Sequence, residues 1–118
     1  VIEAVVVKAL QRTILITDAM SAAGSSDGMY SIGGLEVEVK DSIARLKRND
    51  SLAGSTLTME QAFLNFINKD GVSLIDAVHA SSTLPAKLLN LEKIGSIAVG
   101  NKANILHFHQ EKIELLTF

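Results

Sequence analysis

Cysteine is absent from the 118-residue sequence. Without it the chain can form neither a disulfide framework nor a thiolate metal site, as expected in a reducing cytoplasm. No apolar run reaches the roughly eighteen residues of a membrane-spanning helix, and no positively charged region leads into an apolar stretch as in a secretion signal. We therefore expect a soluble, cytoplasmic protein.

Basic clusters are also missing, and the formal net charge is −2. Nothing in the charge pattern indicates binding to nucleic acid or to a membrane surface. With 47% hydrophobic and 20% charged residues, the composition is that of a small globular domain with a core. The sequence begins with Val1 instead of methionine and ends at Phe118 in an apolar-rich segment, so we expect a piece of a longer polypeptide.

A short apolar run that ends in a carboxylate organises the chain. Residues 13–17, β-branched at Ile14 and Ile16, predict one buried strand of the kind found in parallel sheets covered by helices. Catalytic groups gather at the carboxyl ends of such strands, so Asp18 is a candidate catalytic residue. The alternative is that Asp18 caps the turn or helix that follows. Residues 20–30, rich in serine, glycine and alanine, predict a flexible loop.

The next segment alternates between apolar and charged residues. Leu35, Val37 and Val39 alternate with charged residues, Asp41 and Ser42 are turn residues, and apolar sequence then returns. Residues 33–46 therefore predict an antiparallel hairpin.

Before these elements, residues 1–12 mix helix-favouring and strand-favouring side chains, and we expect the end of a helix there.

Two capping boxes predict helix starts in the middle of the chain. Thr58 with Gln61 begins a helix whose aromatic residues at positions 63 and 66 are expected in the core, and Ser73 with Asp76 begins another. His79 lies within the second helix and is expected to be a surface or packed residue. The sequence Leu84-Pro85 is expected to break that helix, with a short new one over residues 86–91.

Gly54 precedes the first of these helices. It allows close approach of a neighbouring segment or a ligand, although ordinary helix capping also explains it. The tail predicts a strand and turn over 94–102 and strands over 103–108 and 113–118. His107 and His109 would share one strand face, which permits a metal site, but no third ligand is suitably spaced and a structural role is favoured.

Four motifs carry a resemblance to a known family. Together they resemble the C-terminal third of the N-acetylglucosamine-6-phosphate deacetylases, in the amidohydrolase superfamily: Ile16–Ala22 (ITDAMSA), Leu52–Met59 (LAGSTLTM), Pro85-Ala86 and Gly95–Asn104 (GSIAVGNKAN). The implied α/β fold is the C-terminal portion of a (β/α)8 barrel, with strands of an appended small β-sandwich. Its parts would be the eighth strand and catalytic loop, a hairpin, barrel-closing helices and sandwich strands: residues 1–32, 33–46, 47–92 and 93–118.

The resemblance also implies a reaction. N-acetylglucosamine 6-phosphate is hydrolysed to glucosamine 6-phosphate and acetate, and Asp18 takes a proton from a metal-bound water and gives it to the leaving amine. The backbone of Leu52, Ala53 and Gly54 contacts the sugar phosphate. The divalent ion (Zn, Fe, Mn, Co or similar) has its ligands on earlier strands, so we expect no metal site in this segment. In its full-length form the protein is expected to be a homo-oligomer.

Three positions depart from the family pattern. Leu84 replaces an asparagine, Asn104 replaces an aspartate, and Ser42 occupies a turn position where glycine is common. The alternative to an enzyme fragment is a truncated or degenerate barrel segment that serves as a packing or assembly module.

We predict that residues 1–118 alone have no deacetylase activity and fold poorly or associate, because one strand of eight cannot close a barrel. The measurement is acetate release by the purified segment with divalent metal and N-acetylglucosamine 6-phosphate. Turnover by a soluble monomer would contradict the prediction.

Overall fold

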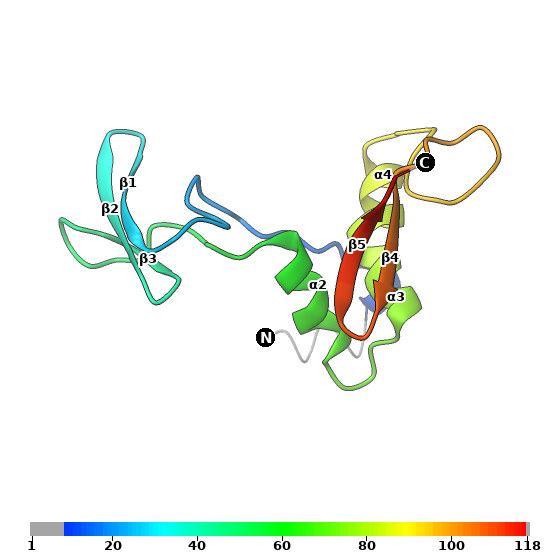
Figure 1. Ribbon diagram of the computed structural model, residues 1–118, viewed down its shortest axis with the longest axis horizontal. Helices are drawn as coiled ribbons and strands as arrows, with labels where there is room; N and C mark the ends of the chain where they lie inside the picture. Colours follow the sequence, from blue (N-terminus) through cyan, green and yellow to red (C-terminus); the bar gives the residue numbers. More distant parts are fainter. Residues whose placement is uncertain (1–8, 118) are drawn as a thin grey trace. The chain divides into compact units, whose positions relative to one another are not determined.

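The structure is a computed structural model that describes residues 9–117. Two compact units divide the chain: Ile16–Ala62, called here the β unit, and the helical unit, made of the residues up to Leu15 and from Phe63 onward (Figure 1). The predicted four-part division by barrel and sandwich stays a prediction.

A three-stranded antiparallel sheet forms most of the β unit. Its strands are β1 Gly28–Ile32, β2 Leu35–Lys40 and β3 Ile43–Leu46, in the order β1-β2-β3. The predicted hairpin over residues 33–46 is confirmed by the β2–β3 pair. The prediction of a loop over 20–30 is wrong from Gly28 onward. The sequence of β1 is rich in small residues and has no strong strand signal, so its structure depends on pairing with β2.

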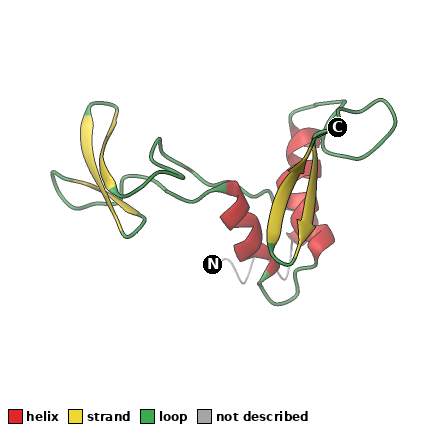
Figure 2. Ribbon diagram, in the orientation of Figure 1, coloured by secondary structure: helices red, strands yellow, loops and turns green. Residues whose placement is uncertain are grey.

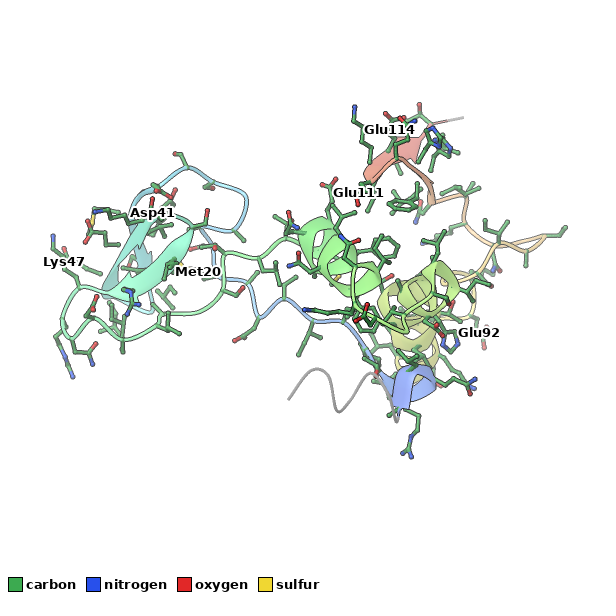
Figure 3. All side chains as sticks on the ribbon, turned by 90° about the horizontal axis from the view of Figure 1, so that it is seen from below. Met20, Asp41, Lys47, Glu92, Glu111 and Glu114 are labelled. Atoms are coloured by element: carbon green, nitrogen blue, oxygen red, sulfur yellow. The ribbon has the colours of Figure 1, made fainter. Side chains whose placement is uncertain are left out.

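The core of this sheet lies on one face of the two predicted strands. Val37, Val39 and Ala44 are buried, together with Ala22 from the preceding turn, and Met20 packs against them. The charged residues between the valines are exposed, as the period of two requires. Figure 3 shows Met20 beside this sheet.

The predicted buried strand over residues 13–17 is not present in the described residues. Leu15 N–H donates to the Ala80 carbonyl at 3.0 Å, but no strand is assigned there, and Ile16 is 78% exposed. A strand buried on both faces needs a covering layer on each side and neighbouring strands for its backbone groups. Those neighbours are not among the residues that the structure describes.

Aromatic and alanine side chains form the core of the helical unit. Phe63 and Phe66 of α2 (Met59–Ile67) are buried with Ala77 and Ala80. The hydroxyl of Thr58 accepts a hydrogen bond from Gln61 N at 3.2 Å, as the capping pattern predicted. Leu10–Arg12 form a 3₁₀ helix, which agrees with the expected helix end; residues 1–8 of that prediction lie outside the described residues.

The second predicted cap is complete. Ser73 and Asp76 form a reciprocal capping box at the start of α3 (Leu74–Val78), with Asp76 N donating to Ser73 Oγ at 3.1 Å. Ser73 also donates through its hydroxyl and its backbone N–H to the Asp76 carboxylate, and these bonds lower the pKa of Asp76. His79 adds a smaller effect of the same sign.

The helix does not break at Pro85. α3 continues through a π-helical turn, His79–Thr83, into α4, Leu84–Leu88 (Figure 2). Leu84 keeps helical angles, φ −67° and ψ −44°, and its N–H donates to the His79 carbonyl five residues earlier. The wider turn shifts the hydrogen-bond register just before Pro85, which has no N–H to donate, so the helix tolerates the proline.

The tail forms one hairpin. β4 (Ile105–His109) pairs antiparallel with β5 (Lys112–Leu116), which confirms two of the three predicted strands. Phe108 of β4 meets Phe63 edge-on, with ring centroids 5.7 Å apart. The strand predicted within 94–102 is not formed, because Asn101 instead closes a loop by donating to the Ser96 carbonyl at 3.0 Å. Within residues 9–117 no helix is long and apolar enough to cross a membrane.

We predict that the Asp76 cap makes stability depend on pH. Its pKa in the folded protein lies below the ordinary value of 3.8, so the unfolded chain binds the proton more readily. The stabilisation is fully present above pH 3.8 and is lost as the pH falls through the lowered pKa. Urea denaturation of the full-length wild-type and Asp76→Asn proteins should show a stability difference that shrinks below that pH.

Ser73→Ala is the matched variant, because it removes the side-chain bond that lowers the Asp76 pKa most. It should weaken the pH dependence while leaving the carboxylate in place. If the difference in unfolding free energy between wild type and Asp76→Asn stays constant from neutral pH to below pH 3.8, the cap is not the source of the pH dependence.

Candidate active site

Asp18 has an unusual backbone conformation. Its φ is +51°, in the left-handed region, and its side chain is exposed. Asp41 and Ser42 also have positive φ and form a two-residue hairpin turn, while Asp50, with φ +60°, resembles Asp18 in lying outside such a turn. Aspartate tolerates this region better than most residues, and strained backbone positions cluster at functional sites. No sequence signal predicted this conformation.

Two backbone hydrogen bonds hold the Asp18 segment against Ser55. Ser55 N donates to the Asp18 carbonyl at 3.2 Å, and Met20 N donates to the Ser55 carbonyl at 2.8 Å. Ala19 and Ser55 thereby form a short parallel bridge. The backbone of Asp18 therefore lies directly beside Ser55, the residue that follows Gly54.

Leu52, Ala53 and Gly54 run between β3 and this bridge. Ala53 N donates to the Ala44 carbonyl at 2.9 Å, and Leu52 forms an antiparallel bridge with Arg45. Ala53 N–H and Ser55 N–H donate to the carbonyls of Ala44 and Asp18, whereas no hydrogen bond from the Gly54 N–H to another described residue is present.

The backbone conformation at position 54 favours glycine. Its φ is +109°, which side chains with a Cβ rarely adopt. A Cβ added there would lie 3.4 Å from Met20 Cβ and 3.9 Å from the Asp18 carbonyl oxygen, which is ordinary van der Waals contact. The backbone angle at Gly54, and not a lack of space, therefore favours glycine beside the Asp18–Met20 segment.

An open cavity of about 720 Å³ adjoins this segment within the β unit. Leu52 and Gly54 line it, while Asp18 and Ala53 are not among its lining residues. Hydroxyl groups supply much of its polar lining: Ser25, Ser42, Ser55, Thr56 and Thr58. The cavity thus offers hydrogen-bonding groups beside the unpaired Gly54 N–H.

The described residues do not fit a divalent metal ion. No group of three or more histidine, aspartate, glutamate or cysteine side chains is close enough to hold one in residues 9–117. His107 and His109 share one face of β4, with parallel rings 6.1 Å apart, and belong to the helical unit.

The chain belongs to the amidohydrolase family, whose model matches residues 9–117. Two curated relatives are the N-acetylgalactosamine-6-phosphate deacetylase of Escherichia coli O157:H7 and the N-acetylglucosamine-6-phosphate deacetylase of Lysinibacillus sphaericus. The first is 38% identical, covering 83% of this chain and 26% of that protein. The second is 44% identical, covering 77% of this chain and 23% of that protein.

A solved structure resembles the chain as well. It is a mutant N-acetyl-D-glucosamine-6-phosphate deacetylase from Mycobacterium smegmatis in complex with N-acetyl-D-glucosamine-6-phosphate. The TM-score is 0.78 at 36% identity, over 86% of this chain and 28% of that one. The match thus spans about a quarter of the length of each of the two curated relatives.

We predict that Gly54→Ala destabilises the full-length protein more than Gly34→Ala does. Both glycines have positive φ, +109° and +83°, but +109° lies further from the left-handed region, about +50° to +70°, that residues with a Cβ can adopt. Left-handed backbone strain costs about 1–2 kcal/mol, and the less accessible φ adds to it in Gly54→Ala. Urea denaturation of both variants measures the difference; equal losses would contradict the stricter need for glycine at position 54.

Proposed function

We propose that the chain is part of a deacetylase that hydrolyses the acetamide of N-acetylglucosamine 6-phosphate to glucosamine 6-phosphate and acetate. Family membership and the names of the relatives support this class of reaction. The observation that carries the proposal is the pairing of the Asp18–Met20 segment with Ser55. It holds an exposed carboxylate beside a segment with an available backbone N–H.

Asp18 is proposed as the general base and then the general acid. Hydrolysis adds water to the carbonyl carbon and breaks the C–N bond, so one proton must leave the water and one must reach the amine. A carboxylate within hydrogen-bond reach can accept the first and deliver it to the leaving nitrogen. The left-handed backbone at Asp18 sets the direction in which its side chain leaves the chain.

Leu52, Ala53 and Gly54 are proposed to bind the substrate. The Gly54 N–H suits an oxygen acceptor, and the missing side chain lets a ligand approach the backbone closely. The Ser25 and Ser42 hydroxyls of the adjoining cavity provide further partners for a sugar phosphate. This assignment agrees with the sugar-phosphate contact that the family resemblance implies.

A divalent ion is part of this proposal, but its ligands would come from residues outside the described range 9–117. Such an ion supplies Lewis-acid chemistry and lowers the pKa of water in enzymes that hold one. Residues 9–117 contain no group of side chains suited to hold such an ion. The proton transfer proposed for Asp18 therefore rests on its carboxylate alone. The cytoplasmic location and the homo-oligomeric state stay predictions.

We predict that Asp18→Asn stops turnover without disrupting the fold. Asparagine has nearly the same size and also tolerates the left-handed region, but it cannot accept the proton. The rate of acetate release by the full-length enzyme should fall by about 10²–10⁴-fold, with metal content and denaturation midpoint largely unchanged. The assay is run with N-acetylglucosamine 6-phosphate and N-acetylgalactosamine 6-phosphate, and the first should be the substrate.

Asp50→Asn is the matched control. Asp50 lies in the same unit, also has a positive φ, +60°, and its side chain is 83% exposed. This variant should keep wild-type activity. Equal activity of Asp18→Asn and wild type would rule out the proton-transfer role, and a full-length wild-type protein without turnover on either sugar would favour the packing module.

A further inference from the structure

A carboxylate distant from the proposed site holds the turn between β2 and β3. Asp27 Oδ2 accepts from Asp41 N at 2.7 Å, and Asp27 Oδ1 accepts from Ser42 N at 3.3 Å. The φ angles of the two turn residues are +51° and +61°, a geometry for which asparagine or aspartate followed by glycine is usual. Asp41 suits the first position, but Ser42 stands where glycine is usual, so the two charge-assisted bonds offset strain at the second position of this turn.

The same turn is bonded to the segment that follows Gly54. The Ser42 carbonyl accepts a hydrogen bond from the Thr56 hydroxyl. Thr56 directly follows Ser55, whose backbone is bonded to Asp18 and Met20. A continuous series of hydrogen bonds and peptide links therefore runs from the Asp27 carboxylate to the Asp18 backbone.

Residues in the middle of this series line the cavity, whereas Asp27, where the series begins, does not. Ser42, Gly54 and Thr56 line the cavity, whereas Asp27 is not among its lining residues. Asp27 therefore acts on the cavity lining by holding the β2–β3 turn, and not by contacting a ligand itself.

We propose that Asp27 and Thr56 are positioning residues, which hold the Leu52–Gly54 segment in place for substrate by fixing the β2–β3 turn against it. The proposal rests on the proposed function for its consequence in catalysis. Neither residue takes part in proton transfer. Their removal should weaken substrate binding more than it slows the chemical step, because Asp18 keeps its carboxylate.

The variants are Asp27→Ala and Thr56→Val in the full-length enzyme. Valine matches the shape of threonine but cannot donate to the Ser42 carbonyl. Thr56→Val removes one hydrogen bond and Asp27→Ala removes two. Each variant should raise KM by about two- to tenfold, the range that corresponds to the loss of such bonds, while kcat changes by less than about threefold. The double variant should be no worse than the more severe single one, since both act through the same turn.

Two further variants separate positioning from general destabilisation. Thr56→Ser keeps the hydroxyl and should restore the wild-type KM, and Asp50→Asn, an exposed carboxylate in the same unit, should leave it unchanged. A KM raised equally in Thr56→Ser, or unchanged in both Asp27→Ala and Thr56→Val, would overturn the proposal.

Amide hydrogen exchange gives a readout that does not depend on activity. In Thr56→Val and Asp27→Ala, peptides that contain the Met20 and Ser55 amides should exchange about tenfold faster, while a peptide containing the Ala77 amide should not change. Unchanged exchange at Met20 and Ser55 would refute the coupling. Faster exchange in a protein whose wild type has no turnover would refute the deacetylase function and leave the coupling supported.

Discussion

Two backbone hydrogen bonds between Ser55 and the segment Asp18–Met20 organise the proposed site. They join a carboxylate in a left-handed conformation to a segment with an available glycine N–H. Neither segment belongs to a regular strand of the sheet, so their relative position depends on these few contacts and on the backbone conformation at Gly54. The three-stranded sheet supports them from one side through Ala44 and the β2–β3 turn.

Local patterns in the sequence predicted the elements that local interactions determine. The alternation at Leu35, Val37 and Val39 predicted β2, because one face of that strand is buried. The caps at Thr58 and Ser73 predicted two helix starts, because each side chain bonds within its own first turn. Such signals need no knowledge of the rest of the fold.

The predictions from sequence were wrong where contacts between residues far apart in the sequence determine the structure. The run at 13–17 has the composition of a buried strand, but the described residues do not surround it. β1 forms because β2 offers an edge, and the helix passes Pro85 because a π turn precedes it. For the site, the family resemblance supplied Asp18 and Leu52–Gly54, while the Asp27 contacts with residues 41 and 42 have no sequence signature.

The most direct measurement is a crystal structure of the full-length protein with a non-hydrolysable N-acetylglucosamine 6-phosphate analogue. The Asp18 carboxylate should lie within hydrogen-bond reach of the reacting group, about 2.6–3.2 Å, and the Gly54 N–H should donate to the ligand. A ligand bound elsewhere, with Asp18 directed away from it and no contact to Gly54, would contradict the proposed roles of both residues.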